Sequence, residues 1–302
     1  SLQTVIMAAR AIALGEAQVI VAGGMENMTR APFLLEKARQ GYRLGHGELT
    51  DSLIKDGLWD VYNQFHMGNA GELCAARYRF SRQEVDDFAL ESYSRAREAI
   101  TAGSFTREIV PVEVPQKKGA PRIVTDDEEP NRVDLSRLRQ LKPVFQDDGV
   151  LTVGNSPSCN DGAAALVVMA EAEAHRLGLL PLARIVGYAG AALAPEWFTI
   201  APIEAIRRLL KQTGLVVSDI DLFEINEAFS AVSLAINREL GLDAKKVNVN
   251  GGAVALGHPI GATGARILTT LLHAMEARDA RRGLASLCIG GGEALALIVE
   301  RT

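Results

Sequence analysis

The chain has 302 residues, of which 48% are hydrophobic and 23% are charged, as in a soluble globular protein with room for two domains of ordinary size. The formal net charge of −5 argues against a nucleic-acid-binding surface, and no apolar run reaches the roughly 18 residues that cross a bilayer. The three cysteines, Cys74, Cys159 and Cys288, are odd in number and lack metal-like spacing. They predict reduced thiols in an intracellular compartment, and neither a disulfide framework nor a metal site.

The start of the chain predicts a helix and then a strand. Apolar residues recur at helical spacing from Leu2 to Leu14, and an apolar run from Gln18 to Ala22 leads into two glycines. The same unit returns as a helix from Gly264 and a strand from Leu284 to Ile289, again followed by glycines. This repeat predicts two halves of one architecture. In the second half, a block of roughly eighty residues of strand and helix, beginning near Leu182, precedes this unit, so we expect a comparable block ahead of Ser1 in the intact protein.

The middle of the chain, from about residue 29 to 152, is irregular apart from one helix expected from Ser81 to Ala102. Ser81 is suited to cap this helix, and Glu84 stands three residues later, where it would complete a capping box. A buried strand is then expected from Ala163 to Met169.

Helices and strands alternate after about Leu182. We expect an amphipathic helix from Pro202 to Thr213 that ends at Gly214, a strand from Ile220 to Ile225, and a helix from Glu227 to Leu240. This alternation is typical of an α/β fold.

Polar residues mark three ends of these buried elements. Asn226 stands at a strand-to-helix junction, His258 lies in a glycine-rich turn between Asn248 and Gly264, and Cys288 comes just before three glycines. Glycines allow the backbone to approach a ligand closely, so we expect these turns to present their polar side chains to a substrate.

Together the three motifs resemble those of the thiolase family, the acetyl-CoA acetyltransferases and 3-ketoacyl-CoA thiolases. Val21–Met28, Phe65–Gly68 and Asn160–Ala165 also match the family, so the resemblance covers essentially the whole chain. It implies the α/β thiolase fold, in which two βαβαβαββ halves pack as five αβαβα layers with an inserted loop domain.

The resemblance also implies domain boundaries. The N-terminal half would comprise residues 1–28 and 160–181, and the C-terminal half residues 182–302. Residues 29–159 would form the loop domain, which binds coenzyme A and makes oligomer contacts.

Four positions are assigned to catalysis by the resemblance. Cys288 would be the acid/base that removes the α-proton of the second acyl-CoA, and Gly290 would offer its N–H to an oxyanion. His258 would activate the nucleophilic thiol and hold the thioester oxygen, helped by a water that Asn226 positions. Without the resemblance, simpler roles fit each residue: a packed strand cysteine, a core histidine and a helix N-cap.

A second set of positions would contact the coenzyme A arm or the acyl group, again by resemblance: His66, Met67, Arg132, Phe145, Ser156, Ala228 and Phe229. Arg132 is the candidate for a phosphate because a guanidinium pairs with phosphate in bidentate fashion, although a solvated arginine fits as well. Phe229 fits the protein core equally, and the histidine–methionine pair fits a surface histidine beside a core methionine. Pro157 replaces a family serine that bonds the pantetheine and has no hydroxyl, so Ser156 or Ser158 would substitute for it.

The favoured function is an acyl-CoA C-acyltransferase that catalyses reversible Claisen condensation of two acetyl-CoA, or thiolysis of a 3-ketoacyl-CoA, by a ping-pong cysteine mechanism. In the family the nucleophilic cysteine would fall about three residues before Ser1. Coenzyme A would be a substrate and product, with no tightly bound cofactor. We expect a homodimer or homotetramer of the cytoplasm, active in fatty acid metabolism, that binds neither nucleic acid nor membrane.

The alternative is a non-catalytic acyl-CoA or lipid-binding protein of thiolase-like fold. A phosphate-binding loop at Gly257–Gly264 is disfavoured, because this segment lacks both the Lys-Ser/Thr ending and the dinucleotide fingerprint.

Overall fold

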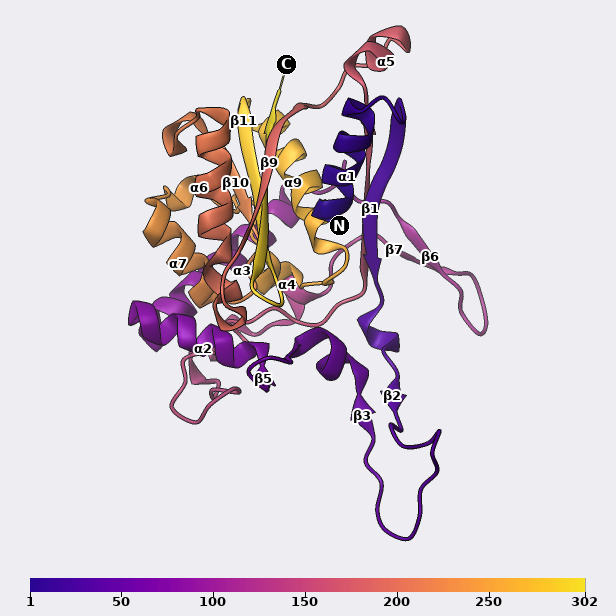
Figure 1. Ribbon diagram of the computed structural model, residues 1–302, viewed down its shortest axis with the longest axis vertical. Coiled ribbons are helices and arrows are strands. Elements are labelled where there is room, and N and C mark those ends of the chain that lie inside the picture. The colour runs from indigo at the N-terminus through magenta and orange to yellow at the C-terminus, as the bar shows by residue number, and fades with distance from the viewer. Residues whose placement is uncertain (302) are drawn as a thin grey trace.

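A four-stranded sheet organises the C-terminal half of the protein in the computed structural model, which describes residues 1–301 (Figure 1). The strands lie in the order β10 (Leu222–Ile225), β11 (Arg282–Ile289), β12 (Glu293–Glu300) and β9 (Arg184–Ala192). β10 and β11 run parallel, whereas β12 is antiparallel to both of its neighbours. Val247 forms an isolated parallel bridge with Phe223 of β10. This bridge occupies the position of the fifth strand that the predicted βαβαβαββ half contains.

Helices cover both faces of this sheet. α6 (Ala201–Thr213) and α7 (Ser230–Leu240) pack on one face, and α1 (Leu2–Ala13) and α9 (Thr263–Ala277) pack on the other (Figure 1). Neighbouring strand residues alternate between the two apolar clusters, since side chains of a strand point to opposite faces in turn. Both faces are therefore buried, which explains why β10 reads as a continuous apolar run broken only by a buried glutamate.

A second, smaller sheet lies beyond α1 and α9. It consists of β1 (Val19–Glu26) and β8 (Gly162–Met169), which pair antiparallel over their whole length and pack on these two helices. The protein thus has four successive layers in the predicted order: the small sheet of β1 and β8, the helices α1 and α9, the large sheet, and the helices α6 and α7. The outer face of the small sheet is apolar and open, with Val21 70%, Met25 77% and Val167 60% exposed.

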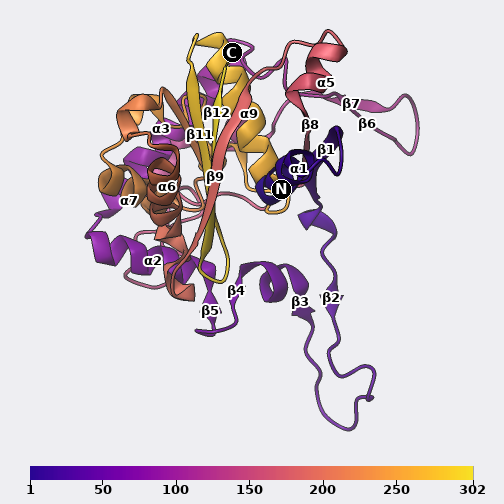
Figure 2. The same cartoon turned by 45° about the horizontal axis from the view of Figure 1, so that its top comes forward.

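The segment between β1 and β8 carries most of the irregular structure. Its helices are α2 (Met67–Tyr78), α3 (Arg82–Thr101) and α4 (Glu129–Arg132). Its strands form three short antiparallel pairs: β2 (Phe33–Leu34) with β3 (Thr50–Asp51), β4 (Trp59–Asp60) with β5 (Phe65–His66), and β6 (Val112–Val114) with β7 (Arg122–Val124). The β2–β3 and β6–β7 arms project away from the layered body in different directions (Figure 2).

The remaining elements are short. They are α5 (Glu171–Arg176), α8 (Ala253–Leu256), one π-helical turn at 53–58 and 3-10 turns at 28–30, 135–140, 195–200, 217–219 and 244–246. No helix in residues 1–301 is both long and apolar enough to cross a membrane.

Most of the predicted elements are confirmed, with boundaries that move by a few residues. Ser81 and Glu84 form the predicted capping box at the start of α3, and Gly214 ends α6 in the left-handed conformation with φ 70°. β1 is longer than predicted and continues through both glycines to Glu26. The domain boundaries stay a prediction, although the β1–β8 pairing does unite the two chain segments assigned to the first half.

One predicted boundary is wrong. The helix expected from Glu227 begins only at Ser230, and its N-cap position is Phe229, so Asn226 is not a helix cap. The physical reason is that Asn226 continues the strand pairing, with its backbone N–H donating to the Ser286 carbonyl at 2.9 Å. Residues 226–229 are an ordered turn between strand and helix, and this turn contributes to the site described next.

Candidate active site

The candidate site lies where β10 and β11 end. These strands are parallel, so their carboxyl ends meet at one edge of the sheet, where ligands of open α/β sheets commonly bind. Asn226 follows β10 directly, and Cys288 is the next-to-last residue of β11. The backbone bond from Asn226 to Ser286 fixes the two chain ends side by side. The structure therefore brings two of the predicted catalytic residues to one edge.

His258 is held at this edge from both sides of its ring. Its backbone N–H donates to the Ser158 carbonyl at 3.1 Å, and its Nδ1 lies 2.7 Å from the hydroxyl of Thr263. That hydroxyl donates to the Pro259 carbonyl at 2.8 Å, so it accepts a hydrogen bond from the Nδ1–H of His258. The opposite nitrogen, Nε2, faces the side-chain nitrogen of Asn226 at 3.4 Å. The ring is consequently oriented with the lone pair of Nε2 toward Asn226.

The surroundings of His258 keep its imidazole neutral. Desolvation by the surrounding protein, and then the positive charge of Arg266, lower the pKa of His258 to about 4. A neutral imidazole near pH 7 can accept a proton at Nε2 and then donate it back from the same atom. This nitrogen can serve first as a base and afterwards as a hydrogen-bond donor to a developing oxyanion.

Asn226 offers a further polar atom beside this nitrogen. Its side chain is only 2% exposed, and its Oδ1 has no hydrogen-bond partner within residues 1–301. A buried amide oxygen without a partner is costly unless a water or a ligand bonds it. The arrangement suits the water-positioning role implied by the resemblance.

Cys288 and Gly290 lie at the carboxyl end of β11. Burial raises the pKa of the Cys288 thiol to about 12, so the thiol is protonated at neutral pH and its thiolate is a strong base. Gly290 begins the turn between β11 and β12 and is exposed. A Cβ atom at Gly290 would lie only 2.4 Å from the Cε of Met67, so the flexible Met67 side chain would have to shift if Gly290 were replaced. Met67, a predicted substrate contact, thus lies against the turn that follows Cys288.

The other two cysteines are not part of this arrangement. Cys74 is fully buried on α2, and burial raises its pKa to about 12, whereas Cys159 is exposed. Neither forms a disulfide, and no cluster of three or more metal-binding side chains occurs in the described part of the chain.

Behind the Asn226–His258 pair lies a buried polar network centred on Glu227. This carboxylate is 1% exposed and accepts hydrogen bonds from Ser92 Oγ at 2.8 Å, Asn248 Nδ2 at 2.9 Å and Val254 N at 3.0 Å. Desolvation raises the pKa of Glu227, and the three donors oppose that shift. The network ties the Asn226 turn to α3 and to α8, the short helix that leads into the His258 turn.

Aromatic side chains from three segments meet beside Met67. The ring of Phe145 stacks on His66 with centroids 5.0 Å apart, and packs edge-on against Phe229 at 5.8 Å. The amide of Asn69 donates to the Phe145 carbonyl at 2.9 Å and fixes its backbone. His66 is part-buried, which lowers its pKa, and its Nδ1 accepts a hydrogen bond from Gly68 N at 3.0 Å at the start of α2. Its contact with a substrate stays a prediction.

Ala228 precedes Phe229 of the same aromatic group, and Ser156 lies eleven residues after Phe145; Ala228 and Ser156 are both buried. The Ser156 hydroxyl has no hydrogen-bond partner among residues 1–301, whereas the Ser158 hydroxyl donates to Asn160 Oδ1 at 2.7 Å. Which of the two serines would substitute for the hydroxyl that Pro157 lacks stays a prediction.

Arg132 stands apart from these residues. It is 66% exposed on α4, and its guanidinium pairs with Glu128 at 3.4 Å and Glu129 at 3.6 Å. The structure shows no contact between Arg132 and the other predicted coenzyme A residues in the described chain. Its assignment to a phosphate stays a prediction.

Comparison with known proteins agrees with this geometry over the whole chain. Family models described as the thiolase N-terminal domain and the thiolase C-terminal domain match residues 1–172 and 179–301. The chain belongs to the thiolase family. An acetyl-CoA acetyltransferase of Pseudomonas aeruginosa is 52% identical over 99% of this chain and 77% of its own length, and one of Escherichia coli is 51% identical over 99% and 76%.

Solved thiolase structures share the fold as well. The acetyl-CoA acetyltransferase of Bacillus anthracis superimposes with a TM-score of 0.96 at 43% identity, covering 100% of this chain and 76% of that one. The Acat5 thiolase of Ascaris suum, solved in complex with coenzyme A, gives 0.94 at 42% identity, covering 100% and 77%. The predicted thiolase fold is confirmed.

Two residues of this thiolase site were missed from the sequence. Glu227 was interpreted as a charge at a helix N-terminus, but it is a buried junction between three segments. Thr263 orients His258, and the only signal was a hydroxyl five residues after the histidine. Both depend on contacts between distant segments or on the path of a turn, which residue spacing alone does not fix.

Proposed function

We propose that this thiolase is an acyl-CoA C-acyltransferase that condenses two acetyl-CoA reversibly to acetoacetyl-CoA, or cleaves a 3-ketoacyl-CoA with coenzyme A. The observation that carries the proposal is the meeting of a neutral His258, bonded to Asn226, with the protonated thiol of Cys288 at one edge of the sheet. The set supplies a proton acceptor, a proton donor and amide groups for an oxyanion, which are the parts that acyl transfer needs.

In the first half-reaction an acyl group passes to the family's nucleophilic cysteine. Nε2 of His258 takes the thiol proton and the thiolate attacks the thioester carbonyl. The coenzyme A sulfur then leaves and takes the proton of Cys288, which becomes a thiolate. The oxyanion formed in between would be stabilised by the protonated Nε2 of His258 and by a water held by Asn226.

The start of α1 supports the position of that nucleophile. Ala265 N, at the start of α9, donates to Ser1 Oγ at 2.9 Å, so Ser1 lies beside the helix that follows the His258 turn. A residue about three positions before Ser1 can lie up to about 10 Å away. The family's cysteine would therefore lie within reach of the start of α9, the helix that follows the His258 turn.

In the second half-reaction Cys288 handles the α-proton. For condensation its thiolate removes a proton from the methyl group of acetyl-CoA, and the resulting carbanion attacks the acyl-cysteine carbonyl. The C–C bond forms as the cysteine sulfur is released, and that sulfur recovers its proton from Nε2 of His258. In thiolysis the same thiol returns the proton to carbon. A pKa raised by burial makes the Cys288 thiolate a strong base for the α-proton and keeps the thiol protonated until that proton is passed on.

Coenzyme A would enter as substrate and product along the group formed by His66, Met67, Phe145 and Phe229. The unpartnered Ser156 hydroxyl supplies a polar contact for the pantetheine arm. We also propose a homodimer or homotetramer in the cytoplasm. Mass measurement of the intact assembly tests the first point, and fractionation of cells tests the second.

The decisive test is turnover by the full-length protein. We expect it to convert acetoacetyl-CoA and coenzyme A to acetyl-CoA, and we expect the Cys288→Ala variant to lose this activity. Chromatography of the thioesters measures the conversion. Binding of coenzyme A without any turnover would instead favour the non-catalytic alternative, which no finding in the comparisons supports.

A further inference from the structure

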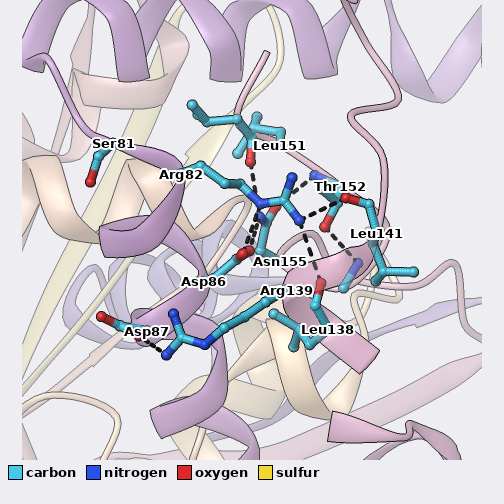
Figure 3. Close-up of polar contacts among 12 residues, drawn as sticks. Ser81, Arg82, Asp86, Asp87, Leu138, Arg139, Leu141, Leu151, Thr152 and Asn155 are labelled. Carbon is cyan, nitrogen blue, oxygen red and sulfur yellow. Dashed lines mark hydrogen bonds and ion pairs between the residues drawn. The ribbon is translucent and has the colours of Figure 1, made fainter. Parts of the chain in front are cut away.

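A buried carboxylate outside the catalytic edge joins α3 to the segment that carries two of the proposed coenzyme A contacts. Asp86 is 1% exposed, although it lies on a helix that is mostly polar. Its Oδ2 accepts a hydrogen bond from Arg82 Nε at 2.8 Å, and its Oδ1 accepts one from Asn155 Nδ2 at 2.8 Å (Figure 3). A carboxylate buried this deeply is stable only when both oxygens are bonded, so the three side chains act as one unit.

Asp86 determines which way the Asn155 amide points. A carboxylate only accepts hydrogen bonds, so the nitrogen of the amide must face Asp86. The amide oxygen is then left to accept from Thr152 N at 2.8 Å, while the nitrogen also reaches the Val150 carbonyl at 3.0 Å (Figure 3). Asn155 is fully buried, so this orientation folds residues 150–155 into a single compact turn.

Arg82 holds the other end of the same segment. Its guanidinium donates to the Leu141 carbonyl at 2.8 Å and to the Leu138 carbonyl at 3.4 Å (Figure 3). Between the two anchors the chain is closed by a backbone bond from Val144 N to the Leu151 carbonyl at 3.1 Å. Residues 141–155 form no helix or strand, so side-chain bonds fix them in place of a regular ladder.

The anchored segment carries Phe145 within it and Ser156 at its end. Asn155 also accepts a backbone bond from Ser230 N at 3.2 Å, so it contacts the start of α7 directly after Phe229. A shift of Asn155 would move Ser156 and the Phe145–Phe229 contact together. The network thus reaches the coenzyme A group without touching the catalytic edge.

We propose that Asp86, acting through Arg82 and Asn155, is a positioning residue that pre-organises residues 141–156 for coenzyme A. This inference rests on the proposed function. Binding is stronger when contact side chains are already ordered, because their entropy is not lost on association. Asp86 would therefore govern the affinity for coenzyme A, whereas proton transfer at Cys288 and His258 would be little affected.

The next residue of α3 offers a matched control. Asp87 carries the same charge and pairs with Arg139, but both side chains are about half exposed, 48% and 49% (Figure 3). An exposed pair of this kind contributes little to stability. Asp87→Asn removes the same charge one residue away and leaves the buried network intact.

The test is titration calorimetry of coenzyme A against the full-length protein and its Asp86→Asn and Asp87→Asn variants. We expect Asp86→Asn to raise Kd about tenfold, the order expected when two contact side chains must be ordered on binding, with the stoichiometry unchanged. Asp87→Asn should stay within about twofold of the unchanged protein. Steady-state kinetics should show the same separation, with KM for coenzyme A raised and kcat retained.

Two results would overturn the inference. One is an unchanged Kd in Asp86→Asn accompanied by a lower stoichiometry or melting temperature, which is the signature of a purely structural role. The other is an equal loss of affinity in Asp87→Asn. Should Asp86→Asn fail to fold, Arg82→Lys, which keeps the charge but loses the forked donor, must raise Kd in the same direction or the inference is wrong. A wild-type protein that does not bind coenzyme A would overturn the proposed function itself.

Discussion

The catalytic edge and the coenzyme A segment are built in opposite ways. At the edge, Asn226 follows β10 and Cys288 is the next-to-last residue of β11, so their positions are set by the backbone hydrogen bonds of a sheet buried on both faces. Residues 141–156 have no such ladder and are held by the side chains of Arg82, Asp86 and Asn155. Chemistry is thus placed on the stiff part of this thiolase, and ligand affinity depends on a polar network that side-chain changes can weaken.

The largest expected effect is that of His258→Ala, at the edge. His258 supplies both a proton acceptor, which contributes a rate factor of about 10²–10⁴, and an oxyanion donor, which contributes about 10²–10³. We therefore expect the rate to fall by about 10⁴-fold or more. Acylation and condensation, measured separately by mass spectrometry and by product formation, should both be lost. A variant that still acylates at the normal rate would remove His258 from thiol activation.

Cys288→Ala should separate the two half-reactions. The nucleophilic cysteine would still become acylated, because His258 and Asn226 remain, whereas condensation should fall by about 10²–10⁴, the range for one acid/base group. Intact mass after incubation with acetyl-CoA reports the acyl adduct. An absent adduct, or condensation that continues, would contradict the role given to Cys288.

A smaller effect is expected from the residue that orients His258. Thr263→Val keeps the shape but leaves Nδ1 of His258 without its acceptor, so we expect a loss of about 10–100-fold in kcat, as when a group that orients a functional histidine is removed. Thr263→Ser keeps the hydroxyl and should recover most of the activity. Equal losses in both variants would show that packing, and not the hydrogen bond, matters at this position.

The two regions also differ in how far the sequence predicts them. Glycine-rich turns mark His258 and Cys288, and a strand-to-helix junction marks Asn226. The parallel strands then bring Asn226 and Cys288 together, so the edge follows from local signals. The Asp86–Asn155 contact joins residues 69 positions apart in the chain and has no periodic signature. The burial of Glu227 is equally hidden from the sequence, because a glutamate after a strand fits a helix start just as well.

The smallest expected effect concerns the free energy of unfolding, and it comes from a glutamate on β10 close to the catalytic edge. Glu224 is 1% exposed on β10, 3.6 Å from Arg266, and desolvation raises its pKa from 4.5 to about 8 against the opposing charge of Arg266. The folded protein therefore binds more protons than the unfolded chain between pH 4.5 and 8, so stability falls as pH rises through this window. Glu108, whose pKa burial raises to about 7, acts in the same direction, whereas His258 acts oppositely only below pH 6.5.

Measurement from pH 6.5 upward isolates the glutamates from His258. Between pH 6.5 and 8 we expect the free energy of unfolding to drop by roughly 2 kcal/mol through Glu224, since one pKa unit corresponds to about 1.4 kcal/mol. Glu224→Gln should flatten this decline, and Glu108→Gln should flatten only its part near pH 7. Denaturant titrations at several pH values give the slopes directly. If Glu224→Gln declines as steeply as the unchanged protein, Glu224 is already ionised in the folded state, and its pairing with Arg266 outweighs the desolvation of the sheet edge.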